Sequence, residues 1–137
     1  MELAGKVAVV TGGNGGLGRR ICLALARANC DVAVIYNKEE EREMAARVAN
    51  ALRELGSKAA VFNCELRDVH SVSAMVASVI ERFGGVDILV NDAAYNKWIP
   101  FDDLDALTFD EWDRIIDTNL TGPMRCIKAV VPSMRAR

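Results

Sequence analysis

The segment from Thr11 to Gly18 contains the residue types that can hold a phosphate group. Five of its eight residues are glycine, and glycine allows positive φ angles and a close approach of the backbone to a ligand. If a helix begins within the segment, its unpaired N–H groups also attract negative charge. Glycine is equally the default residue of any tight turn, so the segment is a candidate anion site only if a strand precedes it and a helix follows it.

Hydrophobic spacing predicts those elements. The uninterrupted apolar run Val7–Val10 predicts a strand that is buried on both faces of a sheet. Further strands are predicted at residues 31–36, 59–62 and 86–90, with helices between them. Strands that alternate with helices predict an α/β fold with a parallel sheet and right-handed crossovers. A flavodoxin-like strand order uses similar elements, and the chemistry of the first turn separates the two alternatives.

The helices have predicted ends and predicted core-facing residues. Asp68 can cap the third helix, and Gly84-Gly85 ends it. A last helix is predicted from a capping box at residues 108–111 through Met134. The residues expected to face the core are Leu17, Ile21, Leu25 and Ala28 in the first helix, Met44, Val48, Leu52 and Leu55 in the second, and Val72, Met75, Val76, Val79, Ile80 and Phe83 in the third.

The composition excludes several classes of protein. A chain of 137 residues suits one domain, and its 51% apolar and 26% charged residues are typical of a globular protein. The formal net charge of −2 leaves no broad positive field for nucleic acid. The sequence has no membrane-length apolar run and no signal-peptide pattern, so a soluble, cytoplasmic protein without a membrane partner is expected. Its four scattered cysteines and single histidine, His70, predict buried free thiols, an exposed histidine and no metal site.

Four motifs in chain order resemble those of the short-chain dehydrogenase/reductase family. Thr11, Gly12, Gly16 and Gly18 have the spacing Thr-Gly-x-x-x-Gly-x-Gly of that family's coenzyme turn. Glu65-Leu66 follows the third predicted strand, where the family usually has Asp-Val or Asp-Leu. The last two motifs are Asn91-Asp92-Ala93-Ala94, where the family has Asn-Asn-Ala-Gly, and Asn119, which matches the asparagine of the catalytic Asn-Ser-Tyr-Lys tetrad.

This resemblance implies a fold, a coenzyme and a reaction. The implied fold is a Rossmann-like doubly wound parallel sheet with strand order 3-2-1-4. The implied reaction is hydride transfer between a nicotinamide dinucleotide and a small alcohol or carbonyl substrate, with Asn119 as a catalytic residue. A homo-oligomer is also expected, because the region of the last helix forms the subunit interface in the family. The implied coenzyme-binding residues are Thr11, Gly12, Asn14, Gly15, Gly16, Leu17, Gly18, Tyr36, Asn37, Lys38, Glu65, Leu66, Asn91, Ala93 and Ala94.

The sequence departs from the family pattern at three positions. Ala94 replaces a glycine and adds a methyl group near the path of the coenzyme, and Asp92 adds a negative charge there. Glu65 in place of aspartate keeps the acceptor chemistry but has a longer reach.

The choice between the two coenzymes depends on the end of the second strand. An acidic residue there would bind the ribose hydroxyls of NAD and repel a 2′-phosphate. The sequence has Tyr36-Asn37-Lys38 instead, which favours NADP(H) with Asn37 and Lys38 as contacts. The acidic run at residues 39–41 argues the other way, although these carboxylates can equally be solvent-facing residues of a first helical turn.

Pro123 lies four residues after Asn119 within the last predicted helix. Proline has no N–H, so we expect a kink that leaves the carbonyl of Asn119 unpaired and facing inward. In the family, that carbonyl holds a water that contacts the catalytic lysine. The alternative is that the proline merely bends a surface helix around the core.

The tyrosine and lysine of the catalytic tetrad have no match in this sequence. Tyr36 is followed four positions later by Glu40, and Tyr95 by Ile99, so neither forms Tyr-x-x-x-Lys. Residues 1–137 are therefore interpreted as a single, incomplete NAD(P)-binding domain that lacks the catalytic part and is inactive alone. The expected consequences are an exposed edge at the fourth strand and exposed apolar residues on the last helix. The alternative is a non-catalytic nucleotide-binding or regulatory module.

For the loop after the fourth strand, two interpretations remain open. Tyr95, Trp98 and Phe101 lie near the place where substrates enter in the family. They either contact substrate or pack within the loop.

Overall fold

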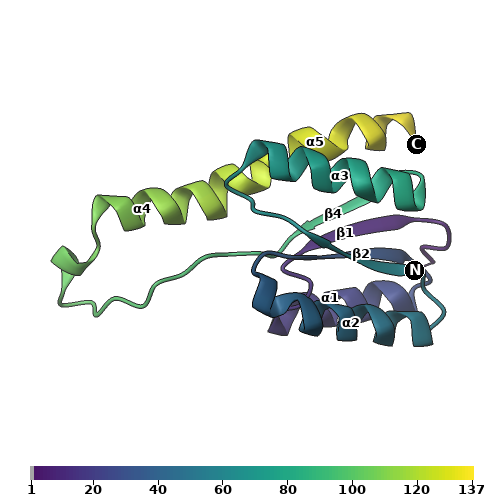
Figure 1. Cartoon of the computed structure of the whole chain (residues 1–137), viewed down its shortest axis with the longest axis horizontal. Helices are drawn as coiled ribbons and strands as arrows, with labels where there is room; N and C mark the ends of the chain where they lie inside the picture. The colour runs from purple at the N-terminus through teal and green to yellow at the C-terminus, as the bar shows by residue number, and fades with distance from the viewer. Residues whose placement is uncertain (1) are drawn as a thin grey trace.

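The computed structural model describes residues 2–137, which form one parallel sheet flanked by helices (Figure 1). The strands are β1 (Val7–Thr11), β2 (Asp31–Tyr36), β3 (Ala59–Asn63) and β4 (Ile88–Asn91). Their order is β3-β2-β1-β4, and every neighbouring pair is parallel. The predicted α/β class and the predicted strand order are therefore confirmed.

The helices cover the two faces of the sheet separately. Helices α1 (Gly16–Arg27) and α2 (Arg42–Glu54) lie together on one face, and α3 (Val69–Phe83) and α5 (Gly122–Ala136) lie together on the other (Figure 1). Each face has its own cluster of buried apolar side chains. The strands supply residues to both clusters because successive side chains of a strand point to opposite faces.

Several local predictions about α3 are confirmed. The Asp68 carboxylate accepts a hydrogen bond of 2.9 Å from the backbone N–H of His70, so Asp68 caps the helix. Gly84 ends the helix with a φ of 89°, a left-handed conformation that favours glycine. His70 is exposed, and the four cysteines are buried and free.

The predicted core faces of α1, α2 and α3 are partly wrong, and in α3 the exception is Ile80, which is exposed. Leu17 is 65% exposed, and the residues of α1 that are buried are Gly18, Cys22 and Ala26. Small residues face the sheet because α1 packs directly against β1 and β2. The Cys22 thiol also donates a weak hydrogen bond of 3.9 Å to the carbonyl of Gly13, in the turn before the helix. In α2, Met44 and Leu55 are exposed, and the buried residues are Ala45, Val48, Ala49 and Leu52.

The last predicted helix is divided in two by a π-helical turn. Helix α4 (Phe109–Ile116) leads into a π turn at Asp117–Thr121 (η3), and α5 follows. The N–H of Gly122 bonds to the carbonyl of Asp117, five residues earlier, instead of to Thr118. Pro123 has no N–H for the carbonyl of Asn119. The sequence predicts a kink in the helix near Pro123, and the structure has a π turn there.

The segment between β4 and α5 projects from the rest of the molecule (Figure 1). It comprises the loop at 92–108, with a short 3-10 turn at Leu104–Ala106 (η2), and then α4. Trp98, Phe101 and Phe109 are exposed along it, and α4 has no buried residue. Trp98 and Phe101 line a second hollow of about 420 Å³ within this segment, which shares Asn96 with the cleft described below.

Among residues 2–137, no helix combines the length and the apolar character that crossing a membrane requires.

Candidate functional site

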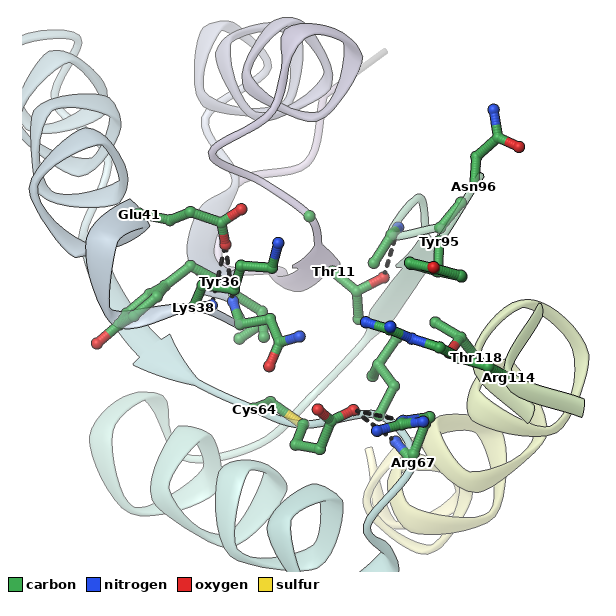
Figure 2. A pocket seen from close by; sticks show the side chains of 17 residues that line it. Thr11, Tyr36, Lys38, Glu41, Cys64, Arg67, Tyr95, Asn96, Arg114 and Thr118 are labelled. Carbon is green, nitrogen blue, oxygen red and sulfur yellow. Dashed lines mark hydrogen bonds and ion pairs between the residues drawn. The ribbon is translucent and has the colours of Figure 1, made fainter. Parts of the chain in front are cut away.

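A cleft of about 350 Å³ opens at the carboxyl edge of the sheet (Figure 2). This is the edge at which ligands bind in open parallel sheets, next to the point where the strand order reverses. Thr11 and Gly12, at the end of β1, form its floor. We call the side formed by residues 36–38, Glu41 and residues 64–67 the strand wall, and the side formed by residues 93–96, Arg114 and Thr118 the α4 wall.

The glycines of the first turn differ in how closely they are packed. Gly12 has a φ of 64°, and a Cβ on it would lie 3.0 Å from the Cα of Ala93. A Cβ on Gly18 would overlap the carbonyl of Gly12. A Cβ on Gly16 would meet nothing within 4 Å. Glycines 12 and 18 therefore allow the first turn, α1 and the segment after β4 to pack together.

The N–H groups at the start of α1 are suited to bind an anion. Among the described residues no side chain caps this helix, and its first turn contains no acidic residue. The first N–H groups of a helix have no partner within the helix and attract negative charge. Asp92 opposes this effect, because its carboxylate lies 2.9 Å from the position that a Cβ on Gly18 would occupy.

Thr11 joins the floor to the segment after β4. Its hydroxyl accepts hydrogen bonds of 3.1 Å from the backbone N–H groups of both Asp92 and Ala93, and it donates to the carbonyl of Val90 at 3.4 Å. The side chain is only 1% exposed. Thr11 therefore positions Ala93 at the edge of the cleft.

The strand wall begins where β2 ends. Asn37 and Lys38 are exposed, and the carboxylate of Glu41 accepts hydrogen bonds from the N–H of Lys38 at 3.0 Å and from that of Asn37 at 3.4 Å (Figure 2). The carbonyl of Asn37 accepts a bond of 2.6 Å from the side-chain amide of Asn63, which holds the ends of β2 and β3 together.

Residues that follow β3 complete the strand wall. Glu65 accepts a hydrogen bond of 3.0 Å from the N–H of Arg67, and their side chains form an ion pair at 3.8 Å. Leu66 is buried. Burial raises the pKa of the Cys64 thiol to about 11, so this thiol is protonated at neutral pH and is not a nucleophile.

The α4 wall contains a cluster of polar side chains. The hydroxyl of Tyr95 donates a 2.9 Å hydrogen bond to Glu111. The guanidinium of Arg114 lies 3.8 Å from the centre of the Tyr95 ring (Figure 2). The Tyr95 hydroxyl, assisted by Lys97 at 3.5 Å, holds the pKa of Glu111 below its ordinary value. Tyr95 thus packs within its own segment.

Asn119 supports the α4 wall from behind. Its side-chain oxygen accepts a 2.7 Å bond from the N–H of Tyr95, and its amide donates a 2.8 Å bond to the carbonyl of Tyr95. Both functional atoms of the side chain are used in this way. The backbone carbonyl belongs to the π turn, and π turns occur often at functional sites.

Arg125 connects the π turn to the strand wall. It donates to the carbonyl of Leu66 at 2.9 Å and to the carboxylate of Asp117 at 2.7 Å. Gly122 packs against the same loop, since a Cβ on it would lie 3.1 Å from the Cβ of Leu66.

The structure brings together a majority of the residues that the sequence singled out for coenzyme binding. The cleft is lined by Thr11, Gly12, Tyr36, Asn37, Lys38, Glu65, Leu66, Ala93 and Ala94. Asn119 lies behind the α4 wall and does not line the cleft. The other predicted residues that lie outside the lining are Asn14, Gly15, Gly16, Leu17, Gly18 and Asn91.

The sequence interpretation missed some of the lining residues. Arg67, Arg114 and Thr118 are exposed or half-buried polar residues for which the sequence predicts no contact with the coenzyme. Arg67 directly follows Glu65-Leu66 and Thr118 directly precedes Asn119, and this adjacency is the signal that could have found them, whereas Arg114 has no such signal. Glu41 was considered only as one member of an acidic run, and its distance of three residues from Lys38 is the signal that distinguishes it, since that is the spacing of a capping pair.

Comparison with known proteins identifies the family. The short chain dehydrogenase family matches residues 6–137. This chain belongs to that family.

Two curated relatives of this chain are named as reductases. A 3-oxoacyl-[acyl-carrier-protein] reductase FabG of Staphylococcus aureus is 36% identical over 130 residues, which are 94% of this chain and 50% of that protein. A sorbose reductase of Candida albicans is 34% identical over 129 residues, covering 94% of this chain and 44% of that protein.

Solved structures agree with the sequence relatives. A dehydrogenase/reductase from Sinorhizobium meliloti 1021 superposes with a TM-score of 0.90 at 30% identity, covering 97% of this chain and 51% of that one. A hydroxysteroid dehydrogenase from Escherichia coli superposes with a TM-score of 0.87 at 28% identity, covering 98% of this chain and 55% of that one. The chain spans about half the length of the curated relatives it matches.

Proposed function

We propose that this chain is the NAD(P)-binding part of an oxidoreductase that transfers hydride between nicotinamide and an alcohol or carbonyl substrate. The observation that carries the proposal is the cleft at the carboxyl edge of the sheet, bounded by Gly12, the end of β2 and the loop after β3. A dinucleotide needs these three parts, which are a close backbone turn, a site for the ribose and a site for the adenine.

The residues present fit such a coenzyme. The first turn holds glycines where a Cβ would collide with backbone, and α1 begins without a capping side chain from any described residue. The pyrophosphate would lie at this helix start, the adenosine ribose beside Asn37 and Lys38, and the adenine beside Glu65 and Leu66. When bound, the nicotinamide would supply or accept the hydride.

Within this proposal, NADP(H) is the preferred coenzyme. Asn37 and Lys38 line the cleft where NAD-binding proteins place an acidic residue. The ammonium group of Lys38 suits a 2′-phosphate, because a phosphate is recognised by positive charge and hydrogen-bond donors.

Isothermal titration calorimetry with NADP⁺ and with NAD⁺ tests the proposal. We expect micromolar affinity for at least one coenzyme, and Lys38→Ala should weaken NADP⁺ binding about fivefold or more while changing NAD⁺ binding less. The matched control is Lys58→Ala, because Lys58 is an exposed lysine that precedes β3 at the opposite edge of the sheet. If the folded protein releases no heat with either coenzyme at millimolar concentration, the proposal is wrong.

The alternative function is a nucleotide-binding or regulatory module without catalysis. Neither tyrosine of the sequence has a lysine four residues later, so residues 1–137 do not themselves contain the Tyr-x-x-x-Lys pair of the family. We therefore expect residues 1–137 to bind coenzyme but not to oxidise NADPH in the presence of ketones. Measurable turnover by the purified chain would contradict this expectation.

The proposal extends to assembly and to compartment. Leu120, Met124 and Ile127 are exposed large apolar side chains on the π turn and α5, and this supports self-association into a homo-oligomer. Four free buried cysteines support a reducing, cytoplasmic location.

A further inference from the structure

We propose that Glu41 is a specificity-determining residue that limits the preference of this cleft for NADP(H). The inference rests on the proposed function, since it concerns the ribose end of the same site. It assigns a role to one carboxylate of the acidic run at residues 39–41, whose members differ in what they contact.

Of the three glutamates, only Glu41 lines the cleft. Glu39 pairs with Arg42 at 3.2 Å, and both of these side chains are largely exposed. Glu40 is exposed and does not line the cleft. Glu41 is half-buried, and its carboxylate is directed back toward the end of β2 (Figure 2).

The Glu41 carboxylate occupies backbone donors that a phosphate would use. Its Oε2 atom accepts from the N–H of Lys38 at 3.0 Å and from the N–H of Asn37 at 3.4 Å. The N–H of Glu41 in turn donates to the carbonyl of Lys38 at 2.9 Å, which fixes the turn. One carboxylate oxygen therefore already binds two adjacent N–H groups, the arrangement by which a backbone holds an anion.

A 2′-phosphate and a free ribose would meet this carboxylate differently. The phosphate carries negative charge, so it must displace Glu41 from the two N–H groups or lie beside a like charge. Ribose hydroxyls can donate hydrogen bonds to the same carboxylate, as they do to the acidic residue that follows the second strand in NAD-binding folds. Glu41 therefore opposes the effect of Lys38, the lysine that lines the same wall of the cleft.

Glu41 could instead serve only to cap the start of α2, and this explanation predicts no effect of its charge on coenzyme choice. The residue lies in the 3-10 turn Glu39–Glu41 (η1) directly before α2, where a carboxylate that accepts backbone N–H groups also stabilises the helix start. Glutamine keeps an oxygen that can accept the same bonds but removes the charge. Glu41→Gln therefore separates capping from electrostatic discrimination.

The test measures the affinity of the 137-residue chain for NADP⁺ and NAD⁺ by calorimetry, in the original protein and in the Glu41→Gln variant. We expect the ratio of NADP⁺ to NAD⁺ affinity to rise about tenfold in Glu41→Gln, chiefly through tighter NADP⁺ binding. The fragments 2′,5′-ADP and 5′-AMP should reproduce this change, because they differ only at the ribose 2′ position. The gain should shrink as sodium chloride is raised from about 0.05 to 0.5 M, because salt screens exposed charges.

Glu40→Gln is the matched control, since it removes the same charge one residue away and outside the cleft. Its affinity ratio should stay within about twofold of that of the original protein. If Glu41→Gln leaves the ratio unchanged, or if both glutamine variants raise it equally, the inference is wrong while the proposed function stands. If the original protein binds neither coenzyme, the proposed function fails and the inference fails with it.

Discussion

The strand wall of the cleft follows two strands of the sheet, the buried β2 and the edge strand β3, whereas the α4 wall stands on segments that project from the body (Figure 1). β2 is buried from Val32 to Tyr36, and a side-chain bond from Asn63 holds the ends of β2 and β3 together. In contrast, α4 has no buried residue, and Tyr95 is held mainly by Asn119 and Glu111. The comparison shows that the part of the cleft proposed to hold the adenosine is built by the core of this chain itself.

The two walls meet at the floor of the cleft, so substitutions that disturb the floor residue Gly12 should have the largest effect. Gly18→Ala would drive a Cβ into the carbonyl of Gly12, and backbone atoms cannot move aside without disturbing β1. We expect this variant to lose about 3 kcal/mol or more of unfolding free energy, with loss of coenzyme binding. Urea unfolding followed by circular dichroism measures the change.

Gly16→Ala is the control for this prediction. A Cβ there meets nothing within 4 Å, and alanine is a better helix former than glycine. Its unfolding free energy should be unchanged or slightly higher. Equal losses in the two variants would show that the contact with Gly12 is not what requires glycine at position 18.

The next largest effect is expected where Thr11 ties the floor to the α4 wall. Thr11→Val removes the hydroxyl that accepts from Asp92 and Ala93, and it leaves two N–H groups without this partner. Unfolding free energy should fall by about 2 kcal/mol. Thr11→Ser keeps the hydroxyl, so the serine variant should bind coenzyme like the original protein while the valine variant binds more weakly. Equal binding by the two variants would contradict the role given to the hydroxyl.

A smaller effect is expected at Asp87, which lies at the opposite edge of the sheet and links the start of β1 to the end of α5. Its carboxylate accepts a 2.8 Å bond from the N–H of Val7 and two 3.0 Å bonds from Arg137, and these contacts lower the pKa of Asp87. Because the folded-state pKa is lowered, the stabilisation is present above the unfolded value of about 4 and is lost as pH falls through the folded value.

Asp87→Asn should therefore reduce unfolding free energy by about 1 kcal/mol at pH 7, and the difference should shrink toward pH 3 as the original carboxylate becomes protonated. Urea unfolding at both pH values measures it. A difference that is constant across this range would contradict an electrostatic cause.

The smallest effect is expected within the α4 wall itself. Tyr95→Phe removes the hydroxyl that donates to Glu111, so the pKa of Glu111 should rise toward its ordinary value. Nuclear magnetic resonance titration of the Glu111 side chain measures this shift. Thermal stability should change little, because the contact is at the surface. An unchanged Glu111 pKa would show that Lys97 or Arg114, and not Tyr95, lowers it.

The strand wall could largely be predicted from the sequence, and the α4 wall could not. Continuous apolar runs identify β1 and β2, and the residues that follow a parallel strand must lie at the carboxyl edge of the sheet. Tyr36, Asn37 and Lys38 were therefore expected at the cleft, and they line it. Arg114 lies on α4 and Thr118 lies in the π turn that follows it. Asn119 of that turn bonds to Tyr95, and no local pattern reveals this contact.

The errors in the helix faces have a common physical cause. The spacing of large apolar residues predicts which side of a helix is hydrophobic, but close packing against a sheet selects small residues. In α1 the turn at Gly12 and Gly13 draws the helix near the strands, so Cys22 and Ala26 face the sheet and Leu17 does not.

The guanidinium of Arg125 has a consequence for exchanging loops between members of this family. It is shared by the carbonyl of Leu66 and the carboxylate of Asp117, which are far apart along the chain. A chimera that receives a foreign loop after β3 but keeps its own α5 would therefore lose the fit between this loop and the Arg125 side chain. The transplanted unit must include the residue at position 125, together with the glycine at 122 that lets the two segments touch.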